Sequence, residues 1–174
     1  MTALEILGVA LVAVVAMVLA QRKAVAAAGG APQRLHSRPS YHGLYTALWV
    51  LLAGWGVLLI LQITSSAYVT QTLLGEIAAS KPDALRIERQ LILSDARAIA
   101  EGTVASRTDD LREAIALRYD SLSTLKWWLV LLGTAVAALG AAAFALSQVN
   151  ADFRARNRAE KVIRAILAAM AAIA

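Results

Sequence analysis

The sequence predicts an all-α membrane protein with three complete transmembrane helices, the start of a fourth, and an extracytoplasmic helical hairpin. Apolar residues make up 59% of its 174 residues and charged residues only 17%, whereas soluble domains are about 45–50% apolar. Cationic connections alternate with a segment of mixed charge, and this alternation predicts how the chain threads the bilayer. Cysteine is absent, which excludes disulfides and thiolate metal sites.

The first apolar run extends from Leu4 to Ala20 and is just long enough to cross a bilayer. A cleaved signal peptide would carry cations before its apolar core. Here the only early charge is Glu5, and Arg22 and Lys23 follow the run. We therefore expect a transmembrane helix, and signal cleavage is the less favoured alternative.

Residues 21–44 form a basic connection, in which the stretch before Ser40 has no acidic residue. Its middle, residues 26–32, has the composition of a flexible link. By the positive-inside rule this connection faces the cytoplasm, so the N-terminus lies outside. We expect Pro39 and Gly43 to break one helix so that the next begins at the headgroup level. The cations are Arg22, Lys23, Arg34 and Arg38.

The second span is predicted from Tyr45 to Ala67, which completes a first region of residues 1–67. Tyr41 and Tyr45 lie at its cytoplasmic edge, where amphipathic rings favour the headgroup region. Gly54 and Gly56 would thin one face for close helix contact, and simple tolerance in lipid is an equally good interpretation.

Residues 68–126 carry nine acidic and eight basic side chains, which predicts a polar domain in water. Ser80 to Asp83 has the pattern of a helix start, with a hydroxyl cap and an early proline. An apolar stripe follows, and Gly102 is a plausible C-terminal stop. One amphipathic helix is expected from about Pro82 to Glu101.

Thr108 and Asp109 are predicted to begin another helix that continues unbroken to near Gln148. At 1.5 Å per residue it would be roughly 60 Å long, about twice the hydrocarbon thickness. Half of it must stand outside the membrane, where its apolar stripe needs a partner. The helix from Pro82 is the obvious candidate, which gives the outer hairpin.

The third span, Trp127 to Leu146 within residues 127–148, is rich in alanine and glycine and suits close protein contact. Residues 149–174 then form a second basic segment, expected on the same cytoplasmic side as the first. The last apolar stretch, from Val162, is too short to span the bilayer. We expect it to be the truncated start of a transport core in a longer protein.

The sequence contains no phosphate-binding loop, nucleophile elbow or zinc-protease motif, so no cofactor, catalytic residue or metal ligand is predicted. His36 and His42 are only a weak signal for a shared metal ion. The favoured interpretation is that they are interfacial histidines that bind headgroups or neighbouring loops. The excess of positive charge is explained by the membrane, and no nucleic-acid partner is expected.

Three stretches resemble the N-terminal region of phosphate ABC transporter permeases of the PstC type. They are Leu35-His36-Ser37-Arg38-Pro39-Ser40-Tyr41-His42-Gly43, Ser94-Asp95-Ala96-Arg97-Ala98-Ile99-Ala100-Glu101-Gly102 and Phe153-Arg154-Ala155-Arg156-Asn157-Arg158-Ala159-Glu160-Lys161. In that family the third leads into the first helix of the permease core. The chain departs from the family where it reads Leu52-Ala53-Gly54, since relatives often hold a proline there.

The resemblance implies a subunit of a phosphate importer in the bacterial inner membrane. Its implied partners are membrane lipid, a second permease subunit, an ATPase subunit that hydrolyses ATP, and an external phosphate-binding protein. The motif residues expected at the cytoplasmic interface are His36, Arg38, Pro39, Tyr41, His42, Gly43, Arg154, Arg156, Asn157, Arg158 and Glu160. Those of the outer hairpin are Asp95, Arg97 and Gly102.

We therefore expect an accessory membrane module that assists transport or assembly without forming the pore. The hairpin, with Asp95, Arg97 and Glu101 on its surface, would contact the partner permease or the binding protein. Two other classes stay open: a sensor whose hairpins form a dimeric four-helix bundle, and a scaffold for a neighbouring subunit. An enzyme is the least favoured class.

Overall fold

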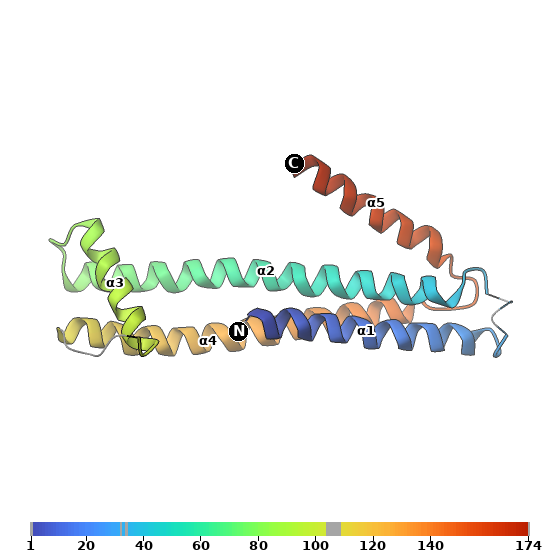
Figure 1. Ribbon diagram of the computed structural model, residues 1–174, viewed down its shortest axis with the longest axis horizontal. Helices are drawn as coiled ribbons and strands as arrows, with labels where there is room; N and C mark the ends of the chain where they lie inside the picture. Colours follow the sequence, from blue (N-terminus) through green and yellow to red (C-terminus); the bar gives the residue numbers. More distant parts are fainter. Residues whose placement is uncertain (1, 32, 34, 104–108, 174) are drawn as a thin grey trace. The chain divides into compact units, whose positions relative to one another are not determined.

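The computed structural model describes residues 2–31, 33, 35–103 and 109–173, in which the chain forms five helices and no β-strand (Figure 1). The helices are α1 (Thr2–Ala27), α2 (Pro39–Ser80), α3 (Arg86–Ala100), α4 (Asp110–Ser147) and α5 (Ala155–Ile173). Three of them, α1, α2 and α4, are long and apolar enough to cross a membrane. The predicted all-α class and its three complete spans are confirmed at this level.

The beginning of α2 differs from the prediction. Pro39 is the first residue of α2, a position that suits proline because its missing N–H would have no partner within the helix. We predicted that Gly43 would interrupt a helix, but it lies inside α2. A Cβ atom on Gly43 would be 2.7 Å from Gln21 Nε2 and 2.8 Å from Met17 Cγ. Gly43 therefore lets α1 approach α2 closely.

The predicted start of the amphipathic helix near Ser80 is wrong. Helix α2 continues to Ser80, whose hydroxyl donates a hydrogen bond back to the Glu76 carbonyl at 3.0 Å. Helix α3 begins only at Arg86. The turn between the two helices is held by Arg89, which donates from Nε to Ala84 O and from Nη2 to Pro82 O, each at 2.9 Å.

The predicted stop at Gly102 is confirmed. Gly102 has φ +70°, a left-handed conformation that glycine adopts without steric cost. Its N–H donates to Ile99 O and the next N–H, of Thr103, donates to Ala98 O, both at 3.0 Å. These two bonds form the Schellman motif that ends many helices.

The long unbroken helix predicted from Asp109 is present as α4, which has 38 residues and is about 57 Å long at 1.5 Å per residue. The predicted cap at Thr108 lies outside the described residues. Asp109 immediately precedes α4, and its carbonyl accepts the N–H of Arg112 at 2.9 Å.

The chain divides into two compact units. The first unit comprises residues 1–59 and 132–174, and its central core is built mainly from small side chains of α1, α2 and α4, namely Ala13, Ala16, Val50, Ala138 and Ala142. The expectation that small residues of the third span permit tight packing is confirmed. Gly54 also serves close contact, because a Cβ there would be 2.6 Å from Val9 Cγ1, whereas Gly56 has open space around it.

The second unit, residues 60–131, has a core to which three helices contribute. Its buried residues are Val69, Leu73 and Ile77 from α2, Ile92, Leu93 and Ala96 from α3, and Ile115 and Ala116 from α4. We predicted a hairpin of two helices, and the structure corrects this to three. The omission came from ending α2 at Ala67, where the apolar run stops but the helix does not.

Candidate functional site

Two motif segments that are far apart in the sequence meet in the first unit. Residues 35–45 contain the end of the α1–α2 connection and the first turns of α2, and residues 151–160 contain the α4–α5 connection and the start of α5. The His36 N–H donates to Ala151 O at 3.2 Å. The Arg156 N–H donates to Ser37 Oγ at 3.5 Å. We call residues 35–45 and 151–160 together the motif junction.

Phe153 is the centre of the motif junction. Its side chain is buried, and its ring centroid lies 5.1 Å from that of Tyr45 and 5.7 Å from that of His42. The Arg158 guanidinium lies over the same ring, 5.0 Å from the centroid. Aromatic pairs in such tilted arrangements gain about 0.5–1.5 kcal/mol beyond the area they bury. The sequence segment that precedes α5 is thus anchored on α2.

Arg156 connects α5 to α2 through a second set of contacts. Its guanidinium lies 5.8 Å from the centroid of the Tyr41 ring, and its Nε donates to Glu160 Oε1 at 2.9 Å. The hydrogen bond to Glu160 and the charge of that carboxylate raise the pKa of Arg156 above its already high usual value. Arg156 is therefore a permanent cation at the motif junction.

The two histidines of the motif occupy different environments. His36 is exposed, whereas His42 is fully buried. Neither ring nitrogen of His42 has a hydrogen-bond partner among the described residues. Of the two expected roles for His42, binding to headgroups or to neighbouring loops, its burial favours the second, since its ring packs on Phe153 of the α4–α5 connection. The described residues contain no group of three or more side chains placed to hold a metal ion.

A polar pocket of about 330 Å³ lies at the motif junction. It is lined by His36, Ser37, Arg38, Tyr41 and Arg156. Four of these five residues belong to one short stretch of the α1–α2 connection and α2, and Arg156 comes from the first turn of α5. The other predicted motif residues of the third stretch, Arg154, Asn157 and Arg158, are exposed.

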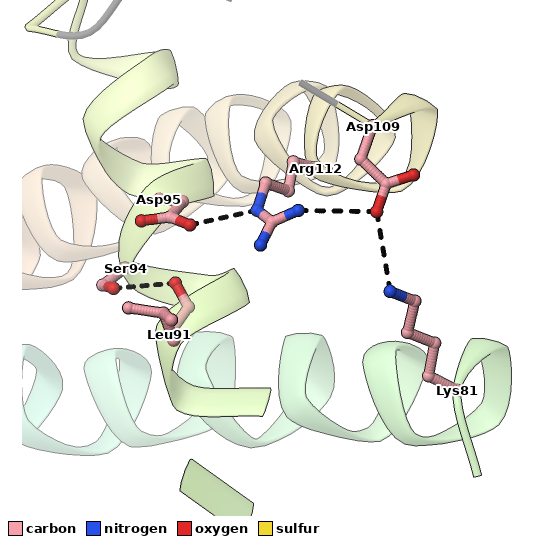
Figure 2. A network of polar contacts seen from close by, with 6 residues as sticks. All are labelled: Lys81, Leu91, Ser94, Asp95, Asp109 and Arg112. Carbon is pink, nitrogen blue, oxygen red and sulfur yellow. Dashed lines mark hydrogen bonds and ion pairs between the residues drawn. The ribbon is translucent and has the colours of Figure 1, made fainter. Parts of the chain in front are cut away.

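One predicted motif residue of the second unit, Asp95, belongs to a separate network of polar contacts (Figure 2). Asp95 on α3 accepts a hydrogen bond from Arg112 Nε on α4 at 3.0 Å. Arg112 Nη1 also lies 3.4 Å from Asp109 Oδ2, and that oxygen is 3.6 Å from Lys81 Nζ. Figure 2 shows these four side chains as one chain of contacts. The network joins α3, the start of α4 and the end of α2.

Arg97 performs a similar role within the second unit. Its Nη2 donates to Thr70 Oγ1 on α2 at 2.8 Å, and its guanidinium lies 5.6 Å from the ring centroid of Tyr119 on α4. We predicted Asp95 and Arg97 as surface groups for a partner. The structure shows both in contacts within the unit, although the Asp95 side chain is still 42% exposed. Their contact with a partner stays a prediction.

Two charged residues of the first unit have surroundings that the sequence did not predict. Glu5, near the start of the first apolar run, is 7% exposed. Lys23 donates from Nζ to Leu146 O at 2.8 Å, which satisfies a carbonyl of the last turn of α4 where the helix dipole favours a cation. The position of Lys23 just after an apolar run was a signal for such a contact, but the partner carbonyl has no sequence signature.

The fold and the motif junction define a helical membrane protein in which the α1–α2 and α4–α5 connections are hydrogen-bonded to each other. The chain belongs to the family described as phosphate ATP-binding cassette transporter, whose model matches residues 6–174. No curated protein and no solved structure matches the chain. The resemblance drawn from the three motif stretches is therefore confirmed at the level of the family.

Proposed function

We propose that this chain is an accessory membrane module of an ATP-driven phosphate importer, which positions α5 for a permease core. The observation that carries the proposal is the motif junction, where Phe153 and Arg156 fix the start of α5 to the first turns of α2. Among the described residues of α5, only Ala155 and Ala159 are buried. The rest of α5 is thus available to other helices.

The charge distribution supports a defined threading. The α1–α2 connection and the α4–α5 connection are hydrogen-bonded to each other, so both belong on the same side of a membrane. The α1–α2 connection is cationic, and although the α4–α5 connection itself has no net charge, the residues that follow it at the start of α5 are cationic. This excess of positive charge favours the cytoplasm. We infer that the N-terminus and the second unit lie outside, and that the membrane is the bacterial inner membrane. ATP would be hydrolysed by a partner ATPase subunit and phosphate delivered by an external binding protein.

The test is phosphate uptake in cells whose only phosphate importer contains this chain. Phe153→Ala removes the anchor of α5, and Phe144→Ala is the matched control because Phe144 is 51% exposed. We expect Phe153→Ala to lower uptake several-fold at an unchanged amount of the chain in the membrane, and Phe144→Ala to leave it within twofold. Equal uptake for wild type and Phe153→Ala would contradict the proposal.

The same cells separate the alternative classes. If Phe153→Ala causes loss of the partner subunits from the membrane, the module is a scaffold for assembly. Removal of residues 68–123, closed by a short linker, tests the second unit, which we propose contacts the partner permease or the binding protein. Normal uptake with an altered cellular response to external phosphate would identify the second unit as a sensor.

A further inference from the structure

The polar pocket at the motif junction has the chemistry of an anion site. Two of its five lining residues are arginines, and Ser37, Tyr41 and His36 add polar groups. Among the described residues, no carboxylate lines it. Its volume of about 330 Å³ falls in the range of ligand pockets, about 300–1,000 Å³. A pocket with donors and cations but no carboxylate favours an anionic ligand.

The charge of Arg38 is not neutralised within the described part of the chain. No carboxylate there lies within 4.0 Å of its guanidinium, whereas six other ion pairs meet that criterion. Arginine binds phosphate through parallel N–H donors in a planar fork. An exposed guanidinium at the mouth of a polar pocket is therefore available to such a ligand.

Arg156 is only partly engaged by its neighbours. Glu160 accepts from its Nε at 2.9 Å, and the other oxygen of the same carboxylate lies 3.8 Å from Arg164 Nη2. One carboxylate is thus shared by two arginines, which leaves a net positive charge beside the pocket. The bond to Glu160 uses Nε alone, so the Nη groups of Arg156 remain as donors.

Ser37 adds an oriented hydroxyl. Its side chain is only 9% exposed, and its Oγ accepts the Arg156 N–H, so the hydroxyl proton is left to donate. The pocket also lies beside the first residues of α2 and α5, Pro39 and Ala155, and helix N-termini carry partial positive charge that stabilises anions. The Ser37 hydroxyl and the two helix N-termini therefore favour an anion, as the two arginines do.

We propose that this pocket binds a phosphate group, supplied either by an anionic phospholipid of the adjacent leaflet or by free inorganic phosphate. Basic pockets between helices at a membrane surface recognise anionic headgroups in this way. A bound phosphate would bridge Arg38 of the α1–α2 connection and Arg156 of α5, and so strengthen the motif junction. This binding site does not depend on the proposed transport function.

The test is titration calorimetry of the purified chain in a neutral detergent with three probes: sodium phosphate, dihexanoyl phosphatidylglycerol and dihexanoyl phosphatidylcholine. Arg38→Gln removes the unpaired guanidinium, and Arg154→Gln is the matched control because Arg154 is exposed and does not line the pocket. We expect Arg38→Gln to weaken binding about tenfold, as the loss of a charge-assisted hydrogen bond does, and Arg154→Gln to weaken it less than twofold.

The probes identify the source of the phosphate group. Binding of phosphatidylglycerol in preference to phosphatidylcholine, sensitive to Arg38→Gln, supports a lipid ligand. Binding of inorganic phosphate alone with the same sensitivity supports a soluble ligand. The proposal is overturned if the wild type binds neither anionic probe, or if both arginine variants weaken binding equally, because that result indicates diffuse surface charge. Equal helix content of all three proteins by circular dichroism confirms that the variants fold.

Discussion

The ring of Phe153 lies edge-on against the ring of Tyr45, with 5.1 Å between their centroids and 64° between their planes. Tyr45 belongs to α2, and Phe153 belongs to the connection that leads into α5. This contact joins the first turns of α2 to the α4–α5 connection, which are more than 100 residues apart in the sequence.

Phe153→Ala should loosen the motif junction. Removing a buried phenylalanine costs about 3–5 kcal/mol, and here the Tyr45 and Arg158 contacts are lost as well. We expect a lower melting temperature in detergent and faster tryptic cleavage at the arginines that begin α5. Phe144→Ala, which removes a half-exposed ring, should change both measurements much less. Equal cleavage rates for the two variants would show that Phe153 is not the anchor.

Gly54→Ala should destabilise the packing of α1 on α2. The new Cβ would lie 2.6 Å from Val9 Cγ1, and valine cannot swing away because its branched side chain is stiff in a helix. Overpacking of this kind costs about 1–3 kcal/mol. Thermal unfolding in detergent measures the loss.

Gly56→Ala is the matched control for this prediction. Gly56 lies two residues further along α2, and nothing lies within 4 Å of a Cβ placed there. Alanine is also the better helix former, by about 1 kcal/mol. We expect a neutral or slightly raised melting temperature. A loss as large as that of Gly54→Ala would mean that glycine itself, and not the contact with Val9, is required.

The sequence predicted those features of the structure whose signals are local, and it missed those that depend on contacts between distant residues. The periodicity of α4 and the stop at Gly102 were predicted because the apolar pattern and the capping glycine act within a few residues. The extension of α2 to Ser80 was missed because its last turns mix polar and apolar residues and so end the apolar run. Their apolar side chains become buried only when α3 and α4 pack against them.

The sequence predicted which residues form the candidate site, but it did not predict which of them contact one another. The first and third motif stretches named most of the motif junction, but nothing local in the sequence indicates that Arg156 approaches Ser37 or that Phe153 approaches His42. For the same reason the contacts of Asp95 and Arg97 within the second unit were not predicted. A charged side chain on an amphipathic helix has the same pattern whether it faces water or, like Arg97, a tyrosine of a neighbouring helix.

Arg112→Gln should loosen the second unit. Arg112 contacts two carboxylates, Asp95 and Asp109, and its side chain is only 22% exposed. Arg118→Gln is the control, because Arg118 contacts Glu76 alone and is 53% exposed. Exposed ion pairs contribute about 0.2–1 kcal/mol, so we expect a loss of about 1 kcal/mol for Arg112→Gln and a smaller one for Arg118→Gln. In 1 M salt the difference should shrink, because screening weakens exposed pairs. A difference that persists there would indicate packing rather than charge.

The threading can be tested with single cysteines, because the chain has none of its own. Gln33 in the α1–α2 connection and Gln90 on α3 are both exposed, so Gln33→Cys and Gln90→Cys make the same chemical change at one cationic connection and in the second unit. The positive-inside rule places Gln33 in the cytoplasm and Gln90 outside. A membrane-impermeant maleimide added to intact cells should therefore label Gln90→Cys and leave Gln33→Cys unlabelled until the cells are permeabilised. The reverse pattern would invert the threading. It would then also remove the proposed access of the second unit to an external binding protein, while the contacts of the motif junction would stand unchanged.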